Sequence, residues 1–368
     1  RHILRAIAIY RSLLAAGVIE VLTEPDETGR RIRLTQDLQL DFALNQPLAP
    51  FALAALELLD LDSPSYPLDL ISVIESIVED PRPVLKAQQF VARGEAVTAM
   101  KAEGIEYTER MALLEDVTHP RPLAELLTGA FETYRRGHPW VGDYEFSPKS
   151  VVRDMTERAM NFAEYVAHYR LARSEGLVLR YLADVYKALR QTVPDEAKTE
   201  PVRDLIAWLG ELVRQVDSSL LDEWEKLADP DAEPLPQDAL LDSAPPITAN
   251  SRAFRVLVRN KLFRLVELAA RRDYVALGEM ELGAGFDEQG WRETVEDYFE
   301  EYDTLGTGPD ARGPDLLMIT EQRDCWRVRQ IFDDPAGDHD WAIEAEVDLA
   351  ASDETGTAVL RVHHVGPG

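Results

Sequence analysis

A proline-rich acidic stretch at 229–246 divides this sequence into two parts with different patterns. It contains five prolines, which interrupt helices and sheets because proline lacks a backbone N–H. The charge also changes sign across it. Residues 217–242 contain nine acids and one base, whereas residues 251–272 contain seven bases and one acid. We therefore predict a linker at 229–248 between two separately folded units.

Before the linker, apolar residues recur at helical spacing. Three amphipathic stripes lie within 151–169, 178–189 and 202–220, and they predict a helical bundle over 61–228. Ser147-Pro148 predicts the start of the first of these helices, because serine caps a helix and proline suits its first turn.

The first 60 residues have a pattern of their own. An apolar helix stops at Gly17, and the runs Val18–Leu22 and Arg30–Thr35 then alternate as two short strands do. A helix followed by a two-stranded hairpin is how a winged-helix unit ends, so 1–60 is predicted to be a winged-helix-like end piece. A plain helix and hairpin is the alternative.

After the linker, helices are followed by strands. A basic helix at Ser251–Arg272 and two shorter helices precede four strand-like runs: Asp315–Thr320, Cys325–Phe332, Trp341–Leu349 and Ala358–Val365. This order predicts an α+β domain at 249–368, with helices packed on a curved antiparallel sheet. By analogy, it is the order of the small cone-shaped folds of the nuclear-transport-factor type. The expected fold class is mainly α with a C-terminal α+β domain.

Composition narrows the function classes. The 368 residues carry a formal net charge of −28, which repels nucleic acid at long range, so any nucleic-acid binding requires local basic surface. The single cysteine, Cys325, excludes an internal disulfide framework and fits a reducing cytoplasm. Apolar runs are too short to cross a membrane, and we expect a cytoplasmic protein with no membrane partner. The opening residues lie inside a helical pattern without Met, which indicates a piece of a longer protein.

Two short runs match enzyme motifs in residue type but not in their sequence context. The run Gly306–Ala311 fits G-x-G-x-x-A, but a helix precedes it and a strand follows, the reverse of a dinucleotide site. The run Asp195–Lys198 resembles a helicase magnesium motif, yet the chain contains no G-x-x-x-x-G-K-[ST] phosphate loop. We expect no catalytic residue and no cofactor in this chain, and Cys325 to be a core thiol.

Two smaller clusters have competing interpretations. Asp334, Asp338 and His339 are weak candidates for a divalent-cation site, although acids are also common in a turn such as this one. The neighbours His363 and His364 should point to opposite faces of a strand and so cannot hold one ion together. The aromatic residues Trp291, Tyr298, Trp326 and Trp341 could line a pocket in the cone-like domain or simply fill its core.

Basic residues on predicted helices are the candidates for nucleic-acid binding, because a basic helix face can follow a phosphate backbone. The alternative is a solvated face whose charges pair with the surplus acids. The candidates are Lys149, Arg153, Arg170, Arg173, Arg180, Lys187, Arg252, Arg255 and Arg259.

Three long strings resemble a known family. They are LTQDLQLDFALNQPL at 34–48, DLISVIESIVEDPRP at 69–83, and YRLARSEGLVLRYL at 169–182, the last followed by DSSLLDEW at 217–224. Together they resemble the C-terminal half of actinobacterial superfamily 2 DEAD/DEAH-box helicases, which carry a C-terminal domain of unknown function. These enzymes are related to the superkiller-type RNA helicases that assist the exosome. The resemblance spans nearly the whole chain.

The resemblance implies that different domains of the parent helicase hydrolyse ATP and bind the strand. Two RecA-like motor domains, absent here, would hydrolyse ATP with Mg²⁺ in the parent helicase, and the winged helix and a ratchet-like bundle would complete the strand channel. Ser174–Arg180 falls where that bundle has a Glu-Gly-x-x-x-Arg helix start, which makes Arg173 and Arg180 the best candidates for strand contact. This chain alone, lacking ATP motifs, is then no ATPase. It would guide single-stranded RNA or DNA.

Two other functions remain open from the residues alone. One is a protein-interaction scaffold, in which the bundle and the C-terminal domain dock partner proteins. The other is a small-molecule-binding domain at 249–368. The choice between RNA and DNA leaves no motif in this chain.

Overall fold

The computed structural model describes residues 46–217, 246–280, 282–283 and 286–368, together with 10, 14, 19–25, 29–34 and 221. Short strands at β1 (Ile19–Val21) and β2 (Ile32–Leu34) pair antiparallel, with Glu20 opposite Arg33, as the predicted hairpin requires. Most of the segment before this hairpin, where a helix was predicted, lies outside the described residues. So do residues 35–45 and the proline-rich part of the linker. The winged-helix interpretation therefore stays a prediction.

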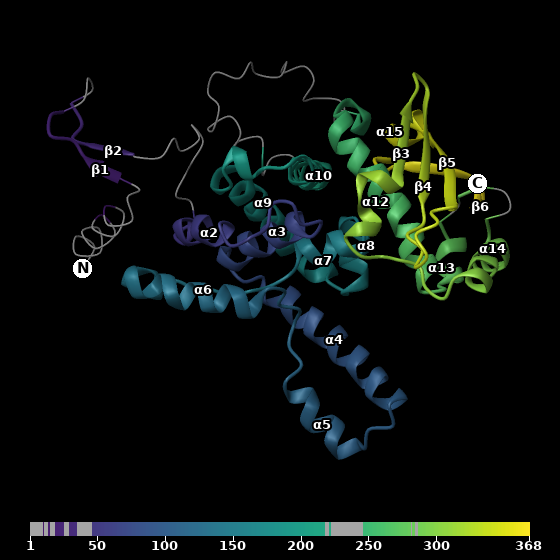
Figure 1. Cartoon of the computed structure of the whole chain (residues 1–368), viewed down its shortest axis with the longest axis horizontal. Helices are drawn as coiled ribbons and strands as arrows, with labels where there is room; N and C mark the ends of the chain where they lie inside the picture. The colour runs from purple at the N-terminus through teal and green to yellow at the C-terminus, as the bar shows by residue number, and fades with distance from the viewer. Residues whose placement is uncertain are drawn as a thin grey trace.

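The first unit is a helical bundle around one buried helix, α3 (Figure 1). This helix, Tyr66–Ile77, is buried along almost its whole length, and Asp69 lies in its first turn, where a negative charge is stabilised by the helix dipole. The other elements of the unit are α2 (Ala49–Leu56), α4 (Arg82–Ala102), α5 (Tyr107–Glu115), α6 (Ala124–Gly137), η1 (Pro139–Asp143), α7 (Val152–Glu157), α8 (Phe162–His168), η2 (Ala172–Ser174), α9 (Glu175–Thr192), η3 (Asp195–Ala197) and α10 (Glu200–Asp217).

The stripe at 151–169 is divided between two short helices, and the prediction of one continuous helix there was wrong. The chain turns at Ala159, whose φ is +49°, and Asn161 then begins α8 with a capping box. Ser147-Pro148 also does not start a helix: α7 begins only at Val152, whose backbone N–H donates to the Glu75 carboxylate. The predicted stripe at 178–189 corresponds to α9, and the one at 202–220 corresponds to α10 up to Asp217, residues 218–220 lying outside the described residues.

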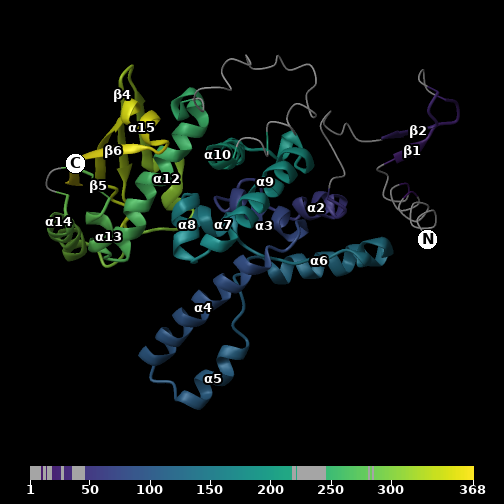
Figure 2. The same cartoon turned by 180° about the vertical axis from the view of Figure 1, so that it is seen from behind.

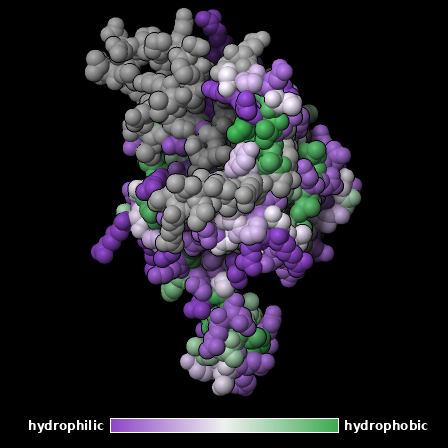
Figure 3. Space-filling model, turned by 90° about the vertical axis from the view of Figure 1, so that its left-hand side faces the viewer, coloured by the Kyte–Doolittle hydropathy of each residue, from purple (hydrophilic) through white to green (hydrophobic). Residues whose placement is uncertain are grey.

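A helical arm, made of α4 and α5, projects from the bundle (Figures 1 and 2). None of the α5 residues is buried, and α4 is buried mainly where it leaves the core. Large apolar side chains lie exposed on the arm, including Phe90 at 76% exposure and Tyr107 at 67%. Figure 3 shows hydrophobic and hydrophilic residues mixed on this projecting part.

The second unit is the predicted α+β domain. Its helical elements are η5 (Ile247–Ala249), α12 (Ser251–Ala270), α13 (Tyr274–Gly278), α14 (Glu288–Glu301), η6 (Asp310–Arg312), η7 (Pro314–Leu316) and α15 (Leu349–Thr355). The four strands, in the order β3-β4-β5-β6, are β3 (Leu317–Glu321), β4 (Cys325–Ile331), β5 (Trp341–Asp348) and β6 (Val359–Pro367). All neighbouring strands are antiparallel, and α12 and α14 cover one face.

The four aromatic candidates of this unit fill its core. Trp291 and Tyr298 of α14 and Trp326 and Trp341 of the sheet are all buried in one cluster, and the Tyr298 and Trp341 ring centres lie 5.4 Å apart. The core interpretation is therefore the one that the structure supports.

The outer face of the sheet carries paired charges. Arg327 lies opposite Glu346, Arg329 opposite Glu344, and Arg361 pairs with Asp348 at 2.6 Å. A β-bulge at Glu344/Ala345 shifts the register of β6. Strict alternation is lost there, and His363 and His364 are both exposed. The expectation that they point to opposite faces was wrong.

Candidate nucleic-acid interface

The nine basic candidates fall into three groups by their surroundings. Lys149 and Arg153 belong to the interior of the bundle. The Lys149 side chain is fully buried (0% exposed), its Nζ lies 3.0 Å from Asp80 Oδ1, and burial lowers its pKa while Asp80 opposes that shift. The Arg153 side chain is 14% exposed and pairs with Asp69 at 2.8 Å and with Glu157 at 2.7 Å. Neither side chain is placed to contact a nucleic acid.

The second group, on α12, connects the two units. Arg252 donates to Glu200 at 2.8 Å, and Arg259 lies 3.4 Å from Asp204, both acids being on α10. Arg255 donates to Glu321 of β3 at 2.5 Å. These pairs match the alternative interpretation of the basic helix, in which its charges pair with the surplus acids of the same chain.

The third group lies where α8 ends and α9 begins. Arg170, Arg173 and Arg180, which we call the α9 arginine row, are exposed. No acid of the described residues lies within 4.0 Å of Arg170 or Arg173, and Arg180 has only Asp184 at 3.9 Å. Lys187 is further along α9 and is partly buried.

The exposed side of α9 is open around these arginines. Gly176 has no atom within 4 Å of the position of an added Cβ, and Leu177 is exposed beside it. Arg173 lies in η2, directly before α9, and Arg180 lies within the first turns of α9. This end of α9 offers two exposed cations and one exposed apolar side chain, a combination suited to phosphates and a base.

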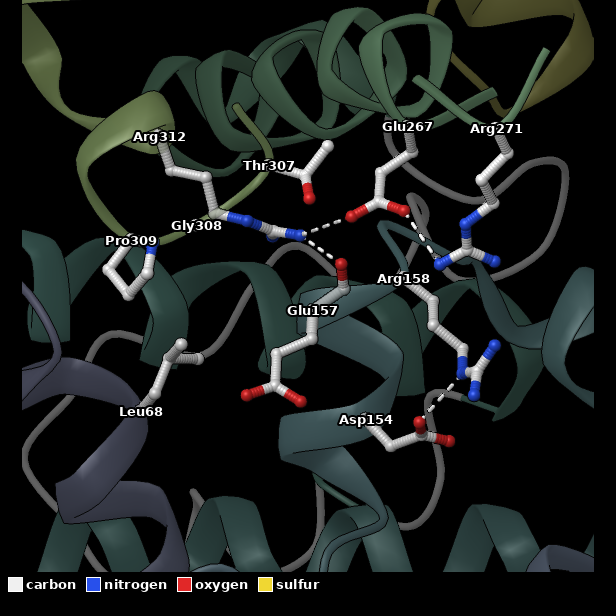
Figure 4. Close-up of a pocket in the computed structure, with 10 residues that line it drawn as sticks. All are labelled: Leu68, Asp154, Glu157, Arg158, Glu267, Arg271, Thr307, Gly308, Pro309 and Arg312. Carbon is white, nitrogen blue, oxygen red and sulfur yellow. Dashed lines mark hydrogen bonds and ion pairs between the residues drawn. The ribbon is translucent and has the colours of Figure 1, made fainter. Parts of the chain in front are cut away.

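Another basic residue, Arg312 of η6, lies at the contact between the two units (Figure 4). It donates to the backbone oxygens of Thr156 and Glu157 at the end of α7, and its guanidinium lies 3.8 Å from Glu267 of α12. Burial lowers the Arg312 pKa to about 10, and Glu267 opposes that shift. We call Arg312 and these three partners the Arg312 junction.

The Arg312 junction borders a polar pocket of about 250 Å³ in which the charges balance. Arg158 donates to Asp154 at 2.8 Å, and Arg271 donates to Glu267 at 2.8 Å (Figure 4). Asp154 and Glu267, which both face the pocket, are therefore each paired with an arginine. The arrangement stabilises the contact between α7 and α12 and leaves little charge for a ligand.

A cleft of about 690 Å³ also lies between the units. Tyr66, Leu68 and Leu205 of the bundle form one side of it, and Val256 and Phe263 of α12 form the other. The cleft reaches the turn that contains His339, but it does not lie under the sheet where a cone-type pocket would be.

The weak metal candidates lie in the turn between β4 and β5. The Asp334 carboxylate accepts the backbone N–H groups of Asp338 at 3.0 Å and of His339 at 2.7 Å, and these bonds lower its pKa against the opposing effect of burial. The carboxylate thus shapes the turn. Across the parts of the chain that the structure describes, no three His, Cys, Asp or Glu side chains are grouped to hold a metal ion.

Sequence reasoning missed the two residues that organise these contacts, Arg312 and Glu75. Arg312 directly follows the Gly306–Ala311 run, which reads as an ordinary loop and in the structure is a loop that ends in the 3₁₀ turn η6. Glu75 lies within an apolar helix, and its neighbours give no sign that it meets α7. A buried acid inside an apolar stripe was the available signal.

The fold and the exposed arginines define a mainly helical protein with a C-terminal α+β domain and a basic surface on its bundle. Within the described residues, no helix combines the length and apolar character needed to cross a bilayer. The chain belongs to the family described as Domain of unknown function (DUF3516), whose model matches residues 1–365. Searches of curated proteins and of solved structures found no match to the chain.

Proposed function

We propose that this chain is the accessory C-terminal region of a cytoplasmic, ATP-dependent RNA or DNA helicase of the actinobacterial superfamily 2 type. ATP and Mg²⁺ would act in RecA-like motor domains that precede it, and the bundle would guide one unwound strand. The observation that carries the proposal is the α9 arginine row. Arg173 and Arg180 stay exposed. Five of the other candidates instead pair with acids of the same chain, namely Lys149, Arg153, Arg252, Arg255 and Arg259.

The charge distribution supports a guiding role rather than tight binding. With a net charge of −28, most of the surface repels phosphates, so a strand would be held only where cations are exposed. Arg173 and Arg180 would each contact a phosphate, and Leu177 between them would contact a base. Weak contacts of this kind let a strand advance as the motor steps.

The test is fluorescence-anisotropy binding of single-stranded RNA and DNA to the full chain over a salt series. We expect affinity to fall with salt and to be lost in Arg173→Glu/Arg180→Glu. The matched control is Arg136→Glu/Arg323→Glu, which changes the net charge equally at two exposed arginines away from α9. Equal losses in both double variants would show a general charge effect and contradict the proposal.

A second candidate function is docking of partner proteins, and the α4–α5 arm favours it. Phe90 and Tyr107 are exposed on a projection that the bundle does not need for its own core. Exposed apolar surface of this kind is typical of interaction sites. Partner capture that is lost in Phe90→Asp, with strand binding unchanged, would support this function over the first.

A further inference from the structure

A pocket of about 400 Å³ lies beside α6, remote from the α9 arginine row in the sequence. We call it the α6 pocket. Its polar wall is formed by His119, Arg121 and Arg135, and its apolar wall by Phe131, Tyr144 and Phe146. The volume falls in the range of about 300–1,000 Å³ that small-molecule sites occupy.

The charge of the α6 pocket is opposite to that of the chain. Glu132 is the single acid among its lining residues, and it pairs with Arg135 at 3.0 Å. Arg135 retains further N–H donors, because a guanidinium has five. No acid of the described residues lies within 4.0 Å of Arg121. In a chain with a net charge of −28, this is a rare place where an anion would be attracted.

His119 also lines the pocket, and its Nε2 is shielded from solvent with no hydrogen-bond partner among the described residues. Burial lowers the pKa of His119, so the positive charge of the pocket comes from the two arginines. The hydroxyl-bearing residues Thr128 and Ser147 also line the pocket and add neutral donors for an anion.

The apolar wall restricts the ligand further. The Phe131 and Phe146 rings are stacked with centres 4.3 Å apart, and Phe131 itself is buried in the bundle core. A wall of fixed aromatic rings opposite two arginines suits a molecule with a flat ring at one end and a phosphate at the other.

We propose that the α6 pocket binds a nucleoside monophosphate, with Arg121 and Arg135 holding the phosphate and the aromatic wall contacting the ring. This site is separate from the α9 arginine row and does not depend on the strand-guiding role. The nucleotide is either free in solution or the 5′-phosphorylated end of a strand, since both present the same chemistry.

The test is calorimetric titration of the full chain with AMP and with inorganic phosphate. We expect saturable AMP binding, weaker binding of phosphate alone, and a loss of at least about tenfold in Arg121→Ala and in Arg135→Ala. Arg136→Ala is the matched control, because Arg136 is exposed on the same helix and does not line the pocket. All three residues are exposed, so these variants are expected to fold.

Three results would overturn the proposal: no saturable binding of AMP, equal affinity for AMP and phosphate, or wild-type affinity in Arg121→Ala and Arg135→Ala. A 5′-phosphorylated oligonucleotide compared with its 5′-hydroxyl form identifies the source of the nucleotide. The variant Arg173→Glu/Arg180→Glu should bind AMP as the wild type does, so a failure of the strand-guiding role remains distinguishable from a failure of this site.

Discussion

The guanidinium of Arg312 lies 4.0 Å from the centre of the Phe263 ring and joins the helical bundle to the α+β domain. Its N–H groups donate to the backbone carbonyl of Glu157 and to that of Thr156, which also accepts the Ala159 N–H at 3.0 Å. A cation at the C-terminus of a helix is also stabilised by the helix dipole. The Arg312 side chain therefore hydrogen-bonds the last carbonyls of α7 and packs against Phe263 of α12.

Replacing Arg312 should weaken the contact between the units. Arg312→Ala leaves buried Glu267 with one basic partner fewer and removes the hydrogen bonds to the carbonyls of Thr156 and Glu157, at a cost of about 3 kcal/mol. We expect calorimetric unfolding to start at lower temperature and to separate into two transitions. Arg312→Lys keeps the charge but not the planar donors, so its effect should be intermediate. A single unshifted transition for Arg312→Ala would contradict this prediction.

Glu75 should be among the most sensitive positions of the bundle. Its carboxylate accepts the N–H groups of Val151 at 2.7 Å and Val152 at 3.0 Å, and it accepts the Tyr181 hydroxyl at 2.9 Å. Glu75→Ala removes the cap of α7 and leaves these buried donors unpaired, so we expect a loss of about 3–5 kcal/mol in urea unfolding.

A matched variant separates the cap from simple burial. Tyr181→Phe removes one hydrogen bond to Glu75 and keeps the ring, so it should cost about 1.5 kcal/mol. If Glu75→Ala were no more destabilising than Tyr181→Phe, the carboxylate would not be what fixes the start of α7.

These contacts show which parts of the fold the sequence could predict. The stripe of α9 and the strands β4–β6 depend on local patterns and were predicted correctly, although the alternation within β6 breaks at His363 and His364. The break between α7 and α8 at Ala159 was not predicted, because the apolar period continues across it. Lys149 and Arg153 looked like surface cations because sequence shows only their neighbours, whereas their partners are distant in sequence: Asp69 lies in α3 and Asp80 in the loop after it. Pairing across a fold leaves no local signal.

Stability should decrease as the pH falls below about 6.5, the ordinary pKa of histidine. Burial lowers the pKa of His119 and of His168 in the folded chain, and nearby arginines add to the shift. The unfolded chain then binds more protons than the folded chain in this range, so acid favours unfolding. The free energy of unfolding, measured with urea between about pH 5 and pH 7, should therefore rise with pH. The double variant His119→Asn/His168→Asn should reduce the slope of this dependence. An unchanged slope in the double variant would assign the effect to other groups.

Two glycines on the helices beside the α9 arginine row should respond oppositely to alanine. A Cβ on Gly210 of α10 would lie 2.6 Å from Cε2 of Tyr186 on α9, so Gly210→Ala must separate the helices and should cost about 1–3 kcal/mol. A Cβ on Gly176 meets nothing within 4 Å, so Gly176→Ala should stabilise α9 by up to about 1 kcal/mol through helix propensity. Thermal unfolding of both variants measures the difference. If the two substitutions shifted the melting temperature in the same direction, the close packing of α10 on α9 would be wrong. The placement of Arg180 on the outer side of α9 would then need revision as well.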